Sequence, residues 1–148
     1  MMDEILIRLG TAADVDDMAD LEQRCFDDPW SEQALAEDME NPRCLYVVAE
    51  LDGRVVGYVG FWAIVDEGHI NNVAVSPDFR RRRIGAALIE EALRLGTELG
   101  LVNYTLEVRA GNEAAIGLYE KFGFEAVGVR PHYYEVGGED AVIMWRFG

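Results

Sequence analysis

The pattern of apolar and polar residues predicts strands and helices along the whole chain. Runs of β-branched and aromatic residues bounded by turn residues predict strands, and apolar residues three and four apart predict amphipathic helices. Strands are expected at 5–9, 45–49, 55–65, 70–75, 102–108, 124–129 and 141–147. Helices are expected at 11–25, 31–40, 84–99 and 113–122. This order predicts an α/β fold in which about four helices flank a central mixed seven-stranded sheet.

Several boundaries of these elements carry local signals. Thr11 and Asp14 have the spacing of a capping box, and Ser31 is a favoured N-cap residue. Gly100 is expected to end the third helix, because glycine adopts the left-handed conformation that often closes a helix. Asp52-Gly53 predicts a tight hairpin turn between the second and third strands.

Length and composition are those of an ordinary globular protein. A chain of 148 residues, 50% of them hydrophobic, predicts a single domain over residues 1–148. No apolar run approaches the roughly 20 residues of a membrane span, and the N-terminus lacks the basic and apolar segments of a secretory signal. Cys25 and Cys44 lie far apart, without the spacing of a zinc site. We therefore expect two reduced thiols, a cytoplasmic location and no membrane partner.

The charge is strongly acidic, with 13 basic against 28 acidic residues and a formal net charge of -15. Such a surface would repel a polyphosphate backbone, so direct binding of nucleic acid is not expected. It is compatible with a cationic substrate or partner.

One basic block interrupts this acidic chain just before the third predicted helix. Arg80, Arg81, Arg82 and Arg83 precede Ile84, where the helix is expected to begin. A helix N-terminus presents unpaired N–H groups and the positive end of the helix dipole, which together favour an anion such as a diphosphate. A solvated run of charge remains an equally good interpretation of this local pattern. Neither a Walker A loop nor a G-x-G-x-x-G motif is present.

At this block the sequence resembles a known family, the GNAT acetyltransferases. Residues 72–86, N-V-A-V-S-P-D-F-R-R-R-R-I-G-A, resemble motif A of that family. Residues 106–124, which contain L-E-V-R-x-x-N-x-x-A-I-x-L-Y, resemble the RimI type within it, the ribosomal-protein-alanine N-acetyltransferases. Residues 29–32 and 139–144 also resemble that type, so the resemblance extends over essentially the whole chain.

The resemblance implies the GNAT fold and acetyl-CoA as co-substrate. In the family, the backbone of motif A holds the pyrophosphate, and the strand before it holds the pantetheine arm. The residues of this sequence that would bind the coenzyme are Val73, Ala74, Val75, Arg80, Arg81, Arg82, Arg83, Ile84, Gly85, Ala86 and Asn112. Arg83 departs from the pattern, because it stands where the family usually has an inner glycine. An arginine there would be strained at positive φ, and we expect its side chain to point outward.

The resemblance also implies two catalytic residues. Glu107 would be the general base, and Tyr119 would protonate the coenzyme A thiolate. On a strand, Glu107 shares a face with Thr105 and Arg109, while Leu106 and Val108 take the other. The pattern alone favours an exposed strand carboxylate for Glu107 and a packed aromatic residue for Tyr119, and it is the resemblance that favours the catalytic roles.

Three aromatic residues are candidates for the acceptor site. Trp30 and the adjacent Tyr133 and Tyr134 could flank a peptide, although loop aromatics without such a role are nearly as good an interpretation. His69 and His132 are isolated and are expected to be structural or solvent-facing. No metal ligand set is apparent, so no metal is expected.

The resulting hypothesis is an enzyme that transfers acetyl groups from acetyl-CoA to a protein N-terminal amine, in particular an N-terminal alanine of a ribosomal protein. Direct transfer is expected, because the motif holds no cysteine that could form an acyl-enzyme. Alternatives are another protein N-terminus, a lysine or a small amine as acceptor, or a non-catalytic acyl-CoA-binding module.

Overall fold

The structure, a computed structural model, describes residues 5–26, 29–79, 83–133 and 138–148. Its strands are β1 (Leu6–Leu9), β2 (Cys44–Leu51), β3 (Arg54–Ile64), β4 (Glu67–Val75), β5 (Asn103–Arg109), β6 (Glu125–Arg130) and β7 (Ala141–Arg146). Its helices are α1 (Val15–Cys25), α2 (Glu32–Glu40), α3 (Ile84–Glu98) and α4 (Glu113–Lys121), with short 3₁₀ turns η1 (Ala12–Asp14) and η2 (Pro77–Phe79).

All the described strands form one seven-stranded sheet with the order β1-β2-β3-β4-β5-β7-β6. Neighbouring strands are antiparallel except β4 and β5, which are parallel and are connected through α3. The predicted α/β fold and order of elements are confirmed. The prediction was wrong in two details: β4 begins three residues earlier than expected, and the turn η1 precedes α1.

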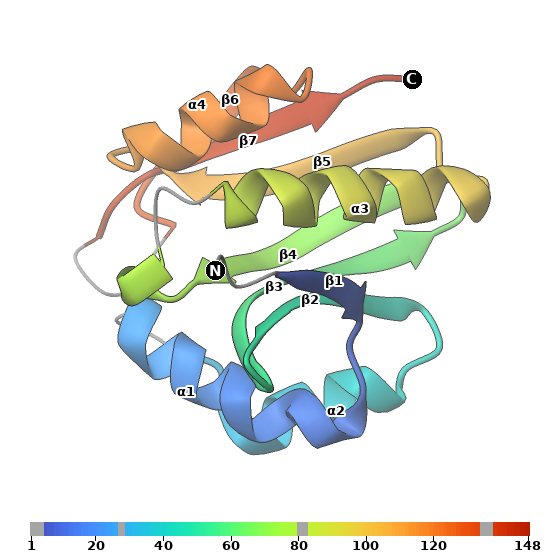
Figure 1. The fold of residues 1–148 in the computed structure, drawn as a ribbon. Helices are drawn as coiled ribbons and strands as arrows, with labels where there is room; N and C mark the ends of the chain where they lie inside the picture. The colour runs from blue at the N-terminus through green and yellow to red at the C-terminus, as the bar shows by residue number, and fades with distance from the viewer. Residues whose placement is uncertain (1–4, 27–28, 80–82, 134–137) are drawn as a thin grey trace.

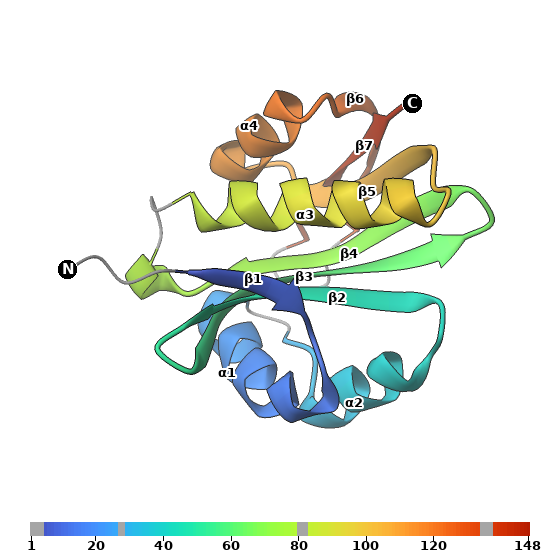
Figure 2. The same ribbon diagram turned by 45° about the vertical axis from the view of Figure 1, so that its right-hand side comes forward.

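Helices cover both faces of the sheet, with α1 and α2 on one face and α3 and α4 on the other (Figures 1 and 2). Each face buries its own core. Met18, Leu35 and Tyr58 belong to the core on the α1/α2 face, and Leu88 and Leu106 belong to the core on the α3/α4 face. No helix in the described ranges is long and apolar enough to cross a membrane.

The predicted caps and turn form as expected. The Ser31 hydroxyl accepts a hydrogen bond from the Ala34 amide at 3.0 Å, and this bond caps α2. Asp14 accepts one from the Thr11 amide at 2.8 Å. Asp52 and Gly53 both have positive φ, at 52° and 78°, as a tight hairpin turn requires. Gly100 has a φ of 88° just beyond α3.

Gly60 in β3 makes room for a buried aromatic ring. A Cβ at Gly60 would lie 2.5 Å from Tyr46 Cε1, in the middle of a fully paired strand. Gly60 therefore has a packing function, because the absence of a Cβ leaves room for the Tyr46 ring.

We predict that Gly60→Ala lowers the free energy of unfolding by about 1–3 kcal/mol, because the new methyl group overpacks the site against Tyr46. Urea denaturation followed by circular dichroism measures this change. Gly117→Ala in α4 is the matched control, since nothing lies within 4 Å of its Cβ. That control should be neutral or stabilising by up to about 1 kcal/mol; equal destabilisation of both variants would contradict the packing argument.

Candidate active site

The central feature of the site is a gap between β4 and β5. The two strands pair from Glu67↔Asn103 to Ile70↔Leu106 and then stop, although β4 continues to Val75 and β5 to Arg109. At the same place the β3–β4 register shifts, so that Asn71 is an extra residue of β4. A bulge of this kind bends its strand. The backbone of β4 beyond it therefore has an unpaired edge on the β5 side.

The ladder with β3 determines which backbone groups face this gap. The Ser76 amide donates to the Val56 carbonyl at 2.8 Å. Because hydrogen-bonded positions alternate along an antiparallel pair, Ala74 also bonds to β3, while Val73 and Val75 direct their N–H and C=O groups away from it. Of the three strand residues proposed to hold a pantetheine arm, Val73 and Val75 are thus directed away from β3, and Ala74 is buried and engaged with β3. The Val75 carbonyl also accepts a hydrogen bond from the Cys25 thiol at 3.3 Å.

The N-terminus of α3 lies just beyond the end of β4. Its N-cap residue, Arg83, is exposed, has a left-handed conformation with φ 61° and ψ 23°, and makes no capping hydrogen bond through its side chain. The inner-glycine position therefore does adopt positive φ, and an arginine occupies it. The first turn of α3 keeps its N–H groups uncapped by that side chain, as an anion site needs.

Gly85, the second residue of α3, also has a packing role besides its proposed part in the anion site. A Cβ at Gly85 would lie 3.2 Å from Leu118 Cδ2, so the glycine allows α3 and α4 to approach each other. Ile84 is buried and Ala86 half-buried in the same turn. Arg80, Arg81 and Arg82 lie outside the described residues.

Glu107 extends from β5 on the α1/α2 face of the sheet. Burial alternates along β5 as predicted: Leu106 and Val108 are buried, and Glu107 is half-buried. Its Oε1 lies 3.5 Å from the Arg130 guanidinium, and its Oε2 is buried without a hydrogen-bond partner among the described residues. A buried acceptor without a donor is costly, so this oxygen has unmet hydrogen-bonding capacity.

Tyr119 lies on the opposite side of the sheet from Glu107. It is buried in the core beneath α4, and its ring centroid is 6.0 Å from that of Phe124. The aromatic packing considered from the sequence is therefore present. Since Glu107 and Tyr119 approach from opposite faces, a single reacting group could meet both only within the gap between β4 and β5.

Trp30 and Tyr133, two of the predicted acceptor residues, lie on the same face as Glu107. Tyr133 is exposed, and the Arg130 guanidinium lies 5.6 Å from its ring centroid. Burial, together with the nearby Glu107 carboxylate, raises the pKa of the Tyr133 hydroxyl. Trp30 is half-buried between α1 and α2. Tyr134 lies outside the described residues.

Two residues of this region were missed in the sequence. Arg130 had no signal, because a single arginine at the end of a predicted strand is common. Glu22 did have one: it lies four residues after Met18, on the apolar face of α1, where a carboxylate is unexpected. It is almost fully buried, and its Oε1 accepts a hydrogen bond from the Trp30 amide at 2.8 Å.

Several other candidates have structural explanations. The Asn112 side chain accepts a hydrogen bond from the Ala115 amide at 3.1 Å and caps α4. His69 contacts Glu67 at 3.2 Å, and His132 is exposed. Neither Cys25 nor Cys44 forms a disulfide. Within the described ranges, no group of three His, Cys, Asp or Glu side chains could hold a metal ion.

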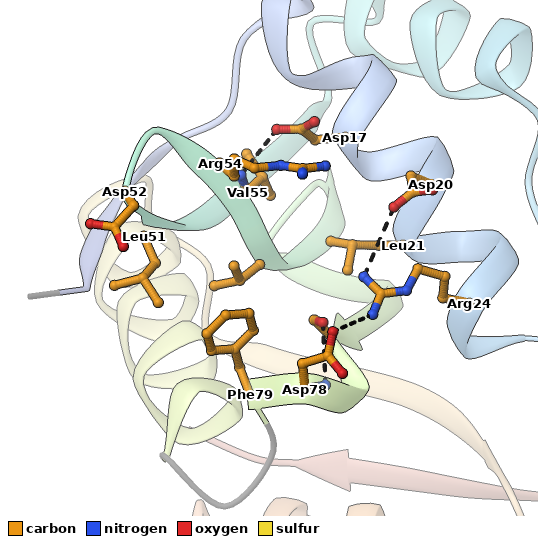
Figure 3. Close-up of a pocket in the computed structure, with 12 residues that line it drawn as sticks. Asp17, Asp20, Leu21, Arg24, Leu51, Asp52, Arg54, Val55, Asp78 and Phe79 are labelled. Carbon is orange, nitrogen blue, oxygen red and sulfur yellow. Dashed lines mark hydrogen bonds and ion pairs between the residues drawn. The ribbon is translucent and has the colours of Figure 1, made fainter. Parts of the chain in front are cut away.

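A separate pocket of about 440 Å³ lies between α1, the β2–β3 turn and η2 (Figure 3). Four aspartates and two arginines line it, and one arginine, Arg24, is already paired with Asp78 at 2.7 Å. This excess of negative charge disfavours a diphosphate. The N-terminus of α3 is therefore the better anion site.

Comparison with known proteins identifies relatives over most of the chain. Residues 15–124 match the model of the acetyltransferase (GNAT) family. The chain is 37% identical over 126 residues to the ribosomal protein bS18-alanine N-acetyltransferase of Escherichia coli, with 84% of each protein covered. It is 39% identical over 142 residues to the N-alpha-acetyltransferase RimI of Mycobacterium tuberculosis, with 92% of this chain and 88% of that protein covered.

A solved structure shows the same similarity in three dimensions. The crystal structure of the ribosomal-protein-alanine N-acetyltransferase from Escherichia coli superposes with a TM-score of 0.91 at 34% sequence identity. The match covers 97% of this chain and 94% of that chain.

We predict that Arg83→Gly is more stable than Arg83→Ala by about 1 kcal/mol, because alanine keeps a Cβ in the left-handed conformation and glycine does not. Chemical denaturation compares the two variants. Both lack the guanidinium, so they also isolate the backbone from the side chain. If the two variants were equally stable, residue 83 would not have positive φ in solution.

Proposed function

Since the chain belongs to the GNAT acetyltransferase family, we propose that it transfers the acetyl group of acetyl-CoA to the α-amine of a protein N-terminus, with the N-terminal alanine of a ribosomal protein as acceptor. The chain is an N-acetyltransferase of the RimI type. The acceptor and the roles of individual residues are what this proposal adds.

The gap between β4 and β5 is the observation that carries the proposal. An extended pantetheine arm can enter it and pair with the backbone of Val73 and Val75, as a short extra strand would. The diphosphate then reaches the first turn of α3, at Ile84, Gly85 and Ala86. Arginines 80–83 add attraction for the phosphates. The thioester is left within the gap, close to Glu107 on one face and Tyr119 on the other.

The reaction requires two proton transfers around one acyl transfer. The neutral amine attacks the thioester carbonyl, forming a C–N bond and a tetrahedral oxyanion, which an N–H group of the exposed β4 edge would stabilise. Glu107, through a water, takes the proton that the amine loses. The C–S bond then breaks, and Tyr119 donates a proton to the departing thiolate. These steps need only the two side chains and the backbone.

An N-terminal amine suits this arrangement better than a lysine. A free α-amine has a pKa of about 8 and a lysine amine about 10.4, so the former gives up its proton far more readily at neutral pH. One carboxylate relay can therefore suffice. The acidic protein, with a net charge of -15, also suits a basic ribosomal acceptor.

We predict that Glu107→Gln and Tyr119→Phe each lower kcat by at least about 100-fold, because each removes one proton transfer. The dissociation constant for acetyl-CoA should stay within about threefold, since neither change touches the diphosphate site. Release of free coenzyme A thiol measures turnover, and calorimetry measures binding. Glu120→Gln, an exposed residue beside Tyr119, is the matched control. Normal turnover in either variant would remove that residue from the mechanism.

We predict that peptides beginning with alanine gain one acetyl group, while peptides with a blocked N-terminus and internal lysines gain none. Mass spectrometry after incubation with the protein and acetyl-CoA detects the product. Peptides that differ only in their first residue test the preference for alanine. Acetylation of lysine alone would replace the proposed acceptor, and binding of acetyl-CoA without any transfer would indicate a non-catalytic module.

A further inference from the structure

Glu22 is a buried carboxylate that the proposed reaction does not use. Only 1% of the residue is exposed, and in the described ranges three donors from three different segments bond to it. Its Oε1 accepts from the Trp30 amide at 2.8 Å. Its Oε2 accepts from the Tyr58 hydroxyl, in a short hydrogen bond, and from Asn72 Nδ2 at 2.9 Å.

The surroundings of Tyr58 keep its hydroxyl protonated. Burial, with the Glu22 carboxylate beside it, raises the pKa of the Tyr58 hydroxyl above its ordinary value. Tyr58 therefore stays protonated and donates, while Asn72 also approaches the Tyr58 oxygen at 3.4 Å. Hydrogen bonds to a charged acceptor are stronger than neutral ones, so the carboxylate holds these three donors firmly.

The three donors lie on both sides of the proposed acceptor site. Trp30 belongs to the segment between α1 and α2, and Tyr58 to β3. Asn72 is the first paired residue of β4 after the extra residue Asn71, where the gap from β5 begins. The carboxylate of Glu22 thus connects the acceptor segment to the strand that borders the gap.

Two more residues in the last turn of α1, Arg24 and Cys25, also contact β4 or the turn that follows it. The Cys25 thiol donates to the Val75 carbonyl at 3.3 Å, and Arg24 bonds to Asp78 in η2 at 2.7 Å. Together with the bond from Asn72 to Glu22, these contacts connect α1 to both ends of the β4 segment that β5 does not pair with, and to η2 beyond it.

We propose that Glu22 is a positioning residue for acetyl transfer: it holds the Trp30 segment at a fixed separation from the unpaired part of β4, so that the acceptor amine meets the thioester in line. This role rests on the proposed function, because it assigns the acceptor to the face that carries Trp30 and Glu107. It differs from simple core filling, because it depends on an oxygen atom at residue 22 and not on the volume of its side chain.

Two substitutions of similar volume separate these roles. Glu22→Gln keeps an oxygen that can accept from the Trp30 amide. Its NH₂ group can donate to the Tyr58 oxygen, because a hydroxyl also accepts hydrogen bonds. The Asn72 side-chain amide can rotate so that its oxygen accepts from the same NH₂ group. Glu22→Met fills the same space and offers no comparable acceptor. A packing role would favour methionine or treat the two alike.

We expect kcat/KM for an alanine-first peptide to fall by at least about tenfold in Glu22→Met and to stay within about threefold in Glu22→Gln. The acetyl-CoA dissociation constant should stay within about threefold in both, because the diphosphate site lies at the far end of β4. Tyr46→Phe is the control for lost stability, since Tyr46 donates a similar short hydrogen bond to Asp38 but contacts neither β4 nor Trp30 through it. Its kcat/KM should be unchanged.

Exchange of the Trp30 backbone amide, followed by NMR, tests the same claim without any acceptor. It should be at least about tenfold faster in Glu22→Met than in the wild type and nearly unchanged in Glu22→Gln. Equal exchange in all three proteins, or equal kcat/KM in the two Glu22 variants, would overturn the positioning role. A wild type that acetylates no peptide would count against the proposed acceptor instead, and the exchange result would still decide whether Glu22 holds the segment.

Discussion

The end of β4–β5 pairing after Ile70 and Leu106 is the constraint on which the rest of this structure depends. A sheet of parallel neighbours would normally continue its ladder, because each unpaired backbone group costs free energy when buried. Here β4 is bent by an extra residue and remains paired only with β3. The unpaired edge is thereby placed between two helical layers, with α3 beginning where β4 ends. A ligand with amide groups can restore the missing hydrogen bonds, so the gap is at once a structural cost and a binding site.

Such a gap needs support from the face that helices α1 and α2 cover. Hydrophobic packing alone is not directional, and it would allow β4 to shift toward β5. The buried polar groups of α1 and β3 are directional: Glu22 accepts from Tyr58 and Asn72 only when β4 stays on the β3 side. Removing one partner of such a cluster leaves a buried polar group unsatisfied, and this penalty is what makes the arrangement specific. The same carboxylate accepts from the Trp30 amide, so it links the segment of Trp30 to the unpaired part of β4.

The distribution of charge suits an anionic coenzyme at the start of α3 and a cationic acceptor elsewhere. The protein carries a net charge of -15, and the pocket beside η2 has twice as many aspartates as arginines. The arginine-rich segment is the exception, and it leads directly into α3, whose N-cap residue, Arg83, makes no capping hydrogen bond through its side chain. Arg83 occupies the left-handed position at this turn despite its Cβ, which shows that the loop geometry there prevails over the preference of a single residue. An anion at α3 and a cationic acceptor over the rest of the surface are both consistent with this distribution.

The order of strands and helices, the caps at Ser31 and Asn112 and the alternation around Glu107 were all predictable from the sequence, because each depends on residues within a few positions of one another. The family resemblance, carried by contiguous motifs, likewise pointed to Glu107, Tyr119 and the start of α3. Only the tertiary structure decided that β4 leaves β5 after Ile70, that Ala74 bonds to β3, and that Arg130 lies beside Glu107. It also brought Glu22 to Asn72, 50 residues away in sequence. These contacts depend on how distant segments pack and pair, and no local pattern of residues encodes that.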